Sequence, residues 1–319
     1  MKKLLLVLLV TCLGASAAQA QTFPSRQTRI LVGAAAGGGS DAFARLIAAK
    51  LGEMWGEAVI VENRTGASST IAADFVAKSA PDGHTVILAT PNSHTIAPHV
   101  MKLPYDVARD FTPLTLVMEV PHVLVVRHDS PANSMKELVQ MAKANPGKLN
   151  YYSSGMGSTQ HLAGELLNLI AGIKVVHVPY KGSAPAIADV IGGNITMGFD
   201  PTSATLGQIK GGKLKVLAVA ANKRASSLPN VPTTAEAGFP GVEMLTWYGL
   251  LGPANMPRPI VEKWHADVVK AVKMPDFQQR IAAVAAESRA STPEEFAEFL
   301  RQENAKMGKL IKAADVKVE

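Results

Sequence analysis

Six short apolar runs in this 319-residue chain each end in a turn rich in glycine, serine or threonine, and each turn leads into a helical pattern. Glycine allows the backbone to approach a ligand closely, and the free N–H groups at the start of a helix carry a partial positive charge. Such turns form a site for a small acidic molecule when they meet at the carboxyl edge of a sheet. The six turns occupy residues 33–41, 62–70, 89–95, 153–160, 179–185 and 200–204.

Hydrophobic periodicity alternates between strand and helix, which predicts an α/β fold with parallel strands. A βαβαβ unit is predicted first, with strands at 29–32, 58–61 and 85–89 and helices at 41–54 and 70–80. A similar unit begins near residue 127, with helices at 135–143, 159–171 and 184–191 and strands at 149–152, 175–178, 195–199 and 215–220. Two α/β lobes are therefore expected.

The last third of the chain differs from the first two. A strand is predicted at 244–252, followed by helices at 258–273, 275–285 and 293–313. The final helix carries apolar residues at helical spacing, so it must pack on a folded surface, and we expect that surface on the first lobe. This predicts a discontinuous first domain, 21–126 and 244–319, and a second domain, 127–243. The two crossings, near 120–130 and 240–250, would serve as a hinge.

The N-terminus has the pattern of a cleaved secretory signal. Lys2 and Lys3 precede the apolar residues 4–13, and the small residues at 18–20 match a signal-peptidase site. The apolar run is too short to span a membrane. We therefore predict that residues 1–20 are removed on export to the periplasm. Lipid attachment at Cys12 is a second interpretation, which Thr11 disfavours.

Composition limits the chemistry of the exported chain. Its only cysteine, Cys12, leaves with the signal, so no disulfide, thiol nucleophile or thiolate metal site is expected. The histidines lack zinc-binding spacing, so neither a metal nor a cofactor is predicted. The formal net charge of +6 is mild, and the basic residues are scattered without interleaved aromatics. Nucleic acid is therefore not an expected partner.

Two enzymatic interpretations deserve comparison with simple binding. The pattern Gly37-x-Gly39-x-x-Ala42 with Glu62 is close to a dinucleotide-binding fingerprint. An exported protein, however, meets little soluble nicotinamide cofactor. The turn near Ser154 and Ser158 lacks the Gly-x-Ser-x-Gly nucleophile arrangement, and no triad order stands out. A solute-binding turn is the preferred interpretation of the first motif, with a purely structural glycine turn as the other.

Two polar residues beside these turns have alternative roles. His161 lies three residues after Ser158, where it would pack or cap a helix or contact a ligand. Asp200 ends a predicted strand before a Pro-Thr-Ser turn. Its carboxylate would accept a hydrogen bond from a ligand hydroxyl or ammonium, or would cap the following helix.

Five segments together resemble the Bug family, the extracytoplasmic solute receptors of tripartite tricarboxylate transporters. They are GGGSDAFAR (37–45), VENRTGASSTIAADFVAKSAPDGHT (61–85), YYSSGMGSTQHLAGELL (151–167), HVPYKGSAPAIADVIGGNITMGFD (177–200) and LPNVPTTAEAGFPG (228–241). The resemblance covers nearly all of the exported chain. It implies a two-lobed type II periplasmic-binding-protein fold whose cleft closes on a small organic carboxylate held mainly by neutral donors.

The resemblance also implies a binding protein without catalysis, which delivers an amino acid, a di- or tricarboxylate or an aromatic acid to integral-membrane transporter subunits. A monomer is expected. A periplasmic hydrolase using Ser154 or Ser158 and a receptor for a signalling system remain alternatives. The ligand-binding positions that the resemblance implies are Gly38, Gly39, Ser40, Asp41, Gly66, Ala67, Ser68, Ser69, Ser154, Gly157, Ser158, Thr159, His161, Tyr180, Lys181, Gly182 and Asp200.

The chain departs from the family pattern beside the expected site. Alanines occupy 34–36 where prolines are usual, and Ser68, Ser69 and Ala72 stand where glycines are usual. His84 replaces a common tyrosine. Because serine side chains at 68 and 69 would project into or beside the cleft, the identity of the ligand does not transfer from a relative.

Overall fold

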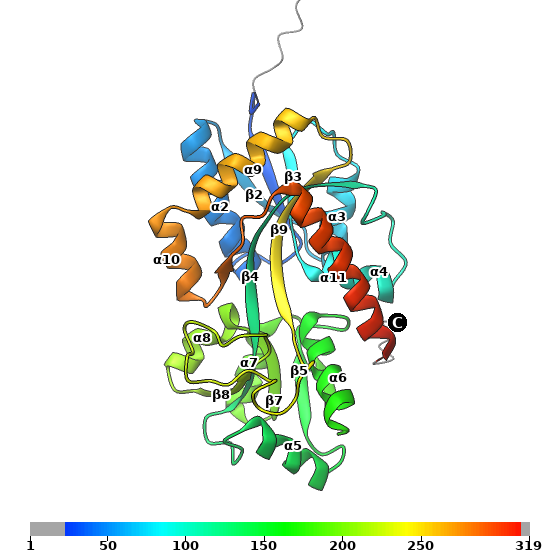
Figure 1. The fold of residues 1–319 in the computed structure, drawn as a ribbon, viewed down its shortest axis with the longest axis vertical. Coiled ribbons are helices and arrows are strands. Elements are labelled where there is room, and N and C mark those ends of the chain that lie inside the picture. The colour runs from blue at the N-terminus through cyan, green and yellow to red at the C-terminus, as the bar shows by residue number, and fades with distance from the viewer. Residues whose placement is uncertain (1–22, 314–319) are drawn as a thin grey trace, which may run out of the picture.

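The computed structural model describes residues 23–313, so the predicted signal peptide lies outside the described residues. Two strands, β4 (Phe111–Arg127) and β9 (Leu245–Pro253), run between an upper and a lower lobe (Figure 1). The strands form one mixed sheet in the order β2-β1-β3-β9-β4-β7-β5-β6, and β8 and β10 also pair with β4. The domain boundaries predicted above stay a prediction.

The first lobe begins with the predicted βαβαβ unit. Strand β1 (Thr28–Val32) pairs in parallel with both β2 (Val59–Asn63) and β3 (Thr85–Ala89). The connecting helices are α2 (Gly39–Trp55) and α3 (Thr70–Ala77). Helix α2 turns its apolar stripe inward, and the left-handed Gly56 ends it. The sequence prediction for this region is confirmed.

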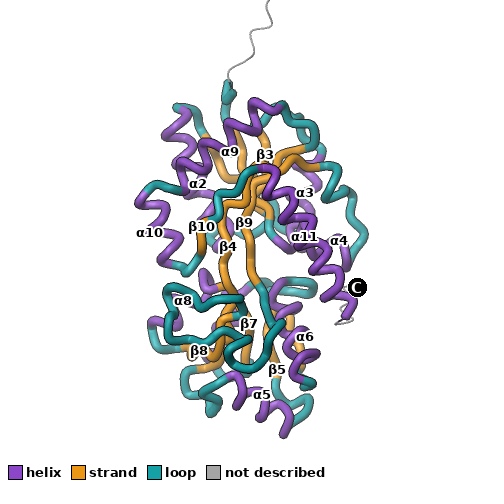
Figure 2. The backbone as a smooth tube through the Cα atoms, viewed as in Figure 1, coloured by secondary structure: helices purple, strands orange, loops and turns teal. Residues whose placement is uncertain are grey.

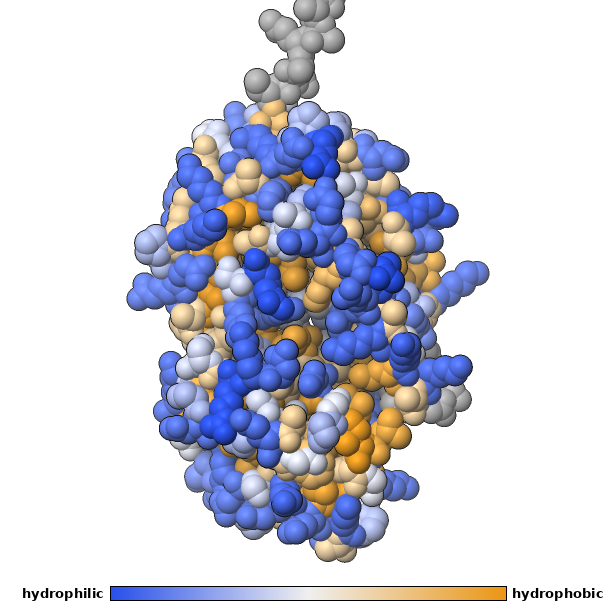
Figure 3. All heavy atoms as spheres, viewed as in Figure 1, coloured by the Kyte–Doolittle hydropathy of each residue, from blue (hydrophilic) through white to orange (hydrophobic). Residues whose placement is uncertain are grey.

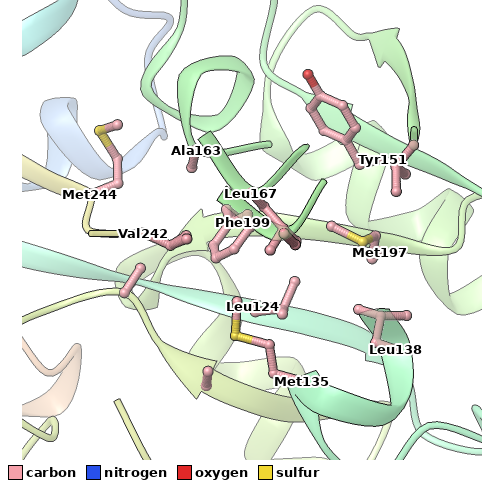
Figure 4. Close-up of a cluster of buried hydrophobic side chains, with 14 of the residues drawn as sticks. Leu124, Met135, Leu138, Tyr151, Ala163, Leu167, Met197, Phe199, Val242 and Met244 are labelled. Carbon is pink, nitrogen blue, oxygen red and sulfur yellow. The ribbon is translucent and has the colours of Figure 1, made fainter. Parts of the chain in front are cut away.

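The second lobe repeats this arrangement around β5 (Asn150–Ser153), which pairs in parallel with β6 (Val176–Pro179) and β7 (Met197–Pro201). Its core side chains come from both the sheet and the helices (Figure 4). The remaining elements of the second lobe are α5 (Met135–Ala144), α6 (Thr159–Ala171), α7 (Ser183–Gly192), α8 (Thr202–Lys210) and β8 (Leu214–Val219).

Strand β4 was not predicted, although it is the longest strand described. As far as Pro121 it pairs with β9, and from His122 onward it pairs with β7 and β8. Figure 2 shows β4 and β9 running together between the two lobes. A proline donates no ladder hydrogen bond, so Pro121 stands where the strand changes partner. The two strands thus connect the lobes at the places where the sequence predicted crossings.

Three elements follow β9 before the final helix, α11 (Pro293–Ala313). The N-terminal part of α11 packs on the first lobe, where Phe296 is fully buried beside Trp247. Its C-terminal part places Met307 and Ile311 in a cluster that joins Ile96 of the first lobe to the core of the second lobe. The prediction of a return to the first lobe is therefore correct but incomplete. The three elements are α9 (Arg258–Val272), α10 (Pro275–Ala283) and β10 (Glu287–Ser288).

Short irregular helices surround the carboxyl ends of the first-lobe strands. A 3₁₀ turn, Ala67–Ser69, precedes α3, and a π-helical turn, Asn92–Ile96, leads into α4 (Ala97–Val100).

No helix among residues 23–313 has the length and apolarity needed to cross a membrane. The face in Figure 3 is largely hydrophilic, and α6 exposes Leu169 and Ile170.

Candidate functional site

All six predicted turns lie at the carboxyl ends of parallel strands β1, β2, β3, β5, β6 and β7. Most of the helices that follow them have no side-chain cap, including α2 after Gly38, α3 after Ser69, α7 after Gly182 and α8 after Pro201. Helix α6 differs, because the Ser158 hydroxyl accepts a hydrogen bond from the N–H of His161. The first N–H groups of α2, α7 and α8 therefore remain available to an anion.

The two lobes approach each other at the N-termini of α2 and α8. A Cβ atom built on Gly39 would lie 3.5 Å from the hydroxyl oxygen of Ser203 and 3.7 Å from that of Tyr248. Gly39 belongs to the first lobe, Ser203 to the second, and Tyr248 to the connecting strand β9. Two partial positive charges thus face each other across the junction between the lobes.

The second first-lobe turn has an unusual backbone. Ala67, Ser68 and Ser69 have φ angles of 42°, 54° and 72°, in the left-handed region that favours glycine. The Ser69 hydroxyl donates to the carbonyl oxygen of Gly33 at 3.1 Å, which ties this turn to the one after β1. Backbone strain of this kind is concentrated at binding sites and persists only where surrounding contacts hold it.

Asp41 lies within the α2 turn, but its oxygens are taken by the protein. They accept hydrogen bonds from the N–H of Gly37, the guanidinium of Arg45 and the side-chain amide of Asn63. The Arg45 hydrogen bond is the main reason that the pKa of Asp41 falls to about 2. The same Asn63 amide also donates to the carbonyl oxygen of Ala34. Asp41 therefore fixes the shape of the turn.

Asp200 is the centre of a buried network in the second lobe. Its side chain is fully buried and accepts hydrogen bonds from Tyr152 at 2.9 Å, Ser183 at 2.9 Å and Gln160 at 3.2 Å. Burial raises the pKa of Asp200 to about 6, although these three hydrogen bonds oppose the rise. Helix α8 receives no side-chain cap, so the interpretation of Asp200 as its cap is wrong.

Gln160 connects Asp200 to the glycine-rich turn after β5, and the sequence analysis missed it. Its carbonyl oxygen accepts from the hydroxyls of Ser154 at 2.8 Å and Thr159 at 3.3 Å, while its amide donates to Asp200. Ser183 and Tyr152 were missed as well. Like Gln160, each lies on a strand or helix without a recognisable motif, and only the fold brings its side chain to Asp200.

A second buried cluster supports the same turn from behind. The rings of His161 and His177 stack with centroids 3.9 Å apart, and His161 Nδ1 accepts from the N–H of Gly157. The hydroxyl of the fully buried Ser153 lies 2.6 Å from His177 Nε2. Burial is the main reason that the pKa of His177 falls to about 4. His161 therefore packs and shapes the turn.

The last predicted group, Tyr180, Lys181 and Gly182, precedes α7. The Tyr180 hydroxyl donates to the carboxylate of Asp189 on α7, and the Lys181 side chain is exposed. Gly182 has a φ of 115°, which only glycine adopts readily. Tyr180 thus ties the turn before α7 to the second half of that helix. The ligand contacts of all the predicted site residues stay predictions.

Among residues 23–313, no three histidine, cysteine, aspartate or glutamate side chains are grouped so that they could hold a metal ion. Within the same range, no lysine, arginine or histidine forms an ion pair with Asp200. The donors described above at the turns are backbone N–H groups and hydroxyls, together with the Gln160 amide, which donates to Asp200. Free N–H groups at helix N-termini can donate hydrogen bonds to an anion.

Two α/β lobes joined by two strands, with uncapped helix N-termini facing each other at the junction, define a two-lobed solute-binding protein. A family model described as "Tripartite tricarboxylate transporter family receptor" matches residues 43–316. The chain belongs to this family, and the resemblance noted from its sequence motifs is confirmed.

Solved structures agree in fold over nearly their whole length. Rpa4515 of R. palustris with adipate is 34% identical, with a TM-score of 0.87 over 92% of this chain and 99% of that chain. The periplasmic binding protein BugD is 35% identical, with a TM-score of 0.85 over 93% and 100%. MatC of Rhodopseudomonas palustris with bound malate is 32% identical, with a TM-score of 0.83 over 91% and 100%. The predicted two-lobed fold is confirmed.

Proposed function

We propose that this protein captures a small organic carboxylate at the junction of its two lobes and delivers it to the membrane subunits of a tripartite tricarboxylate-type transporter. The observation that carries the proposal is the approach of the uncapped α2 and α8 N-termini at Gly39 and Ser203. A carboxylate placed there would accept hydrogen bonds from both lobes. The relatives solved with adipate and malate support this class of ligand.

The proposed binding event closes the lobes. Facing N-termini repel each other weakly, and a bound anion replaces that repulsion with attraction to both helices. Strands β4 and β9 would bend where β4 changes partner, at Pro121 and His122. In this proposal the moving bodies are residues 21–126 with 244–319 and residues 127–243.

The proposed ligand contacts divide by lobe. The first lobe supplies N–H groups at 38–40 and the strained turn at 66–69, and the second lobe supplies the start of α8, the turn at 154–159 and the start of α7. Asp41, His161, Tyr180 and Asp200 contribute by holding these turns in shape. Neutral donors inside a closed site make the affinity only weakly dependent on salt.

The proposal places the protein in the periplasm as a monomer, exported by residues 1–20. It includes no reaction, because Ser154 and Ser158, the two serines considered for a hydrolase, are committed to other contacts. In the described structure Ser154 donates to Gln160, and Ser158 caps α6, so neither hydroxyl meets a histidine ring. A signalling receptor would use the same binding site, and only its membrane partner would differ.

The test begins with mass spectrometry of ligand released from the purified protein and a thermal-shift screen of carboxylic acids. Calorimetric titration then compares the best acid with its amide. We expect the amide to lose measurable binding, because it lacks the charge that helix N-termini attract. Small-angle scattering should show contraction with saturating acid. Equal affinity for acid and amide would contradict an anion site, and hydrolysis of ester substrates would contradict a binding protein.

A further inference from the structure

We infer that Tyr248 is a ligand-binding residue whose hydroxyl donates to the carboxylate held between α2 and α8. The inference rests on the proposed function and adds a residue from the strand that connects the lobes. No turn motif marks Tyr248 in the sequence, since it lies inside an apolar strand.

The position of Tyr248 is fixed by its backbone and its ring. Tyr248 pairs with Met118 of β4, and the next residue, Gly249, pairs with Ala89 at the end of β3. The side chain is 4% exposed, and its ring centroid lies 5.2 Å from that of Phe43 on α2. The hydroxyl therefore reaches the first turn of α2 from the sheet, and the packed ring has little freedom to move.

The chemistry of the hydroxyl suits an anion. Burial raises the pKa of Tyr248 to about 12, and the negative charge of Asp200 contributes in the same direction. The Ser40 hydroxyl lies within hydrogen-bonding reach and opposes that rise, as a donor to the phenol oxygen does. Tyr248 is thus a neutral donor at physiological pH.

The other four tyrosines have committed their protons. Tyr105 donates to the Ser93 carbonyl, and the remaining three donate to carboxylates: Tyr151 to Glu165, Tyr152 to Asp200 and Tyr180 to Asp189. The hydroxyl of Tyr248 lies beside Gly39 and within reach of the Ser40 hydroxyl, which donates to it and leaves the phenol proton unused. Its proton is therefore available at the point where the two lobes meet.

The experiment compares Tyr248→Phe with wild type by calorimetric titration of adipate, malate, glutamate and benzoate. The substitution keeps the ring against Phe43 and removes only the donor. For each acid that wild type binds, we expect the dissociation constant to rise about 10- to 100-fold, the range for a hydrogen bond to a charged group. Tyr105→Phe is the matched control, because it removes a buried first-lobe hydroxyl whose proton is already donated to the Ser93 carbonyl oxygen and is not free for a ligand.

Small-angle scattering at saturating acid distinguishes two roles of the Tyr248 hydroxyl: contact with the ligand, or a direct contact that holds the two lobes together. We expect Tyr248→Phe to contract as wild type does once the ligand is bound. Unchanged affinity would overturn the inference and leave the proposed function standing. Lost contraction at saturation, or an equal loss of affinity in Tyr105→Phe, would also overturn it. If wild type binds none of the acids tested, the proposed function fails and this inference fails with it.

Discussion

The hydroxyl of Ser69 donates to the carbonyl oxygen of Gly33, and the Ser69 side chain occupies the space where a side chain on residue 33 would begin. A Cβ atom built on Gly33 would lie 2.2 Å from the Ser69 Cβ, far inside contact distance. Glycine at 33 and serine at 69 are therefore a matched pair. Together they hold the strained turn after β2 against the turn after β1.

Gly33→Ala should lower the free energy of unfolding by about 1–3 kcal/mol, the range for inserting a group into packed structure. In a Ser69→Gly background the same change should cost less, because the side-chain atoms are gone, although the Cα of residue 69 would still lie 2.7 Å from the new Cβ. Urea unfolding of the two single variants and the double variant measures this coupling. Equal costs of Gly33→Ala in both backgrounds would show that Ser69 is not the obstacle.

Ala67→Gly should raise the free energy of unfolding by about 0.5–1 kcal/mol. The left-handed conformation costs an L-residue about 1–2 kcal/mol, and the greater freedom of glycine in the unfolded chain offsets part of that gain. Ala49→Gly is the control, because residue 49 is exposed in the middle of α2 and should lose about 1 kcal/mol. Thermal unfolding should give shifts of opposite sign, and a loss in both variants would contradict relief of strain at residue 67.

Asp200→Asn should change how stability depends on pH. The folded pKa is about 6, above the unfolded value of about 3.9, so the contribution of this carboxyl is fully present below pH 4. It is lost as the pH rises through 6. The stability of wild type relative to Asp200→Asn should therefore fall by on the order of 2–3 kcal/mol between pH 4 and pH 7. Denaturant titrations at several pH values measure this difference in stability. The difference would stay constant if folding did not change the pKa of Asp200.

His177→Gln should change how stability depends on pH in the opposite direction, because the contribution of His177 is lost when the pH falls. Its folded pKa of about 4 lies below the unfolded value of about 6.5, so its contribution is fully present above pH 6.5 and is lost as the pH falls toward 4. Stability of wild type relative to His177→Gln should fall on acidification by roughly 1.4 kcal/mol per pH unit at most. His128→Gln, at an exposed position, controls for the substitution itself. Parallel profiles for wild type and His177→Gln would contradict this prediction.

Turn chemistry and local periodicity predicted the strands and helices that depend on neighbouring residues. The ends of β1, β2, β3, β5, β6 and β7 were visible because glycine and serine follow an apolar run at each. Local chemistry also accounts for the starts of α5 and α11, where the hydroxyls of Ser134 and Thr292 accept from the N–H groups of Glu137 and Glu295. The repeat of the strand and helix pattern predicted two lobes, and the family motifs added the ligand cleft between them.

The missed elements depend on distant contacts. Almost every residue of β4 is buried, so the strand has no alternation of polar and apolar residues, and Pro113 and Pro121 interrupt it. Gln160 and Tyr248 carry no local signal, because their importance comes from Asp200 and Ser40 far along the chain. A pattern within ten residues cannot show which side chains meet across lobes.

The placement of α11 has a consequence for the order in which the protein matures. Met307 and Ile311 complete the second-lobe core that Leu138 and Leu162 begin, although well over a hundred residues separate them in the chain. Contacts this distant close late in folding. A chain still emerging from the ribosome therefore lacks part of that core until residues 307–311 have been made. The synthesis of α11, and not the translation of the second lobe itself, sets the moment at which this core can pack fully.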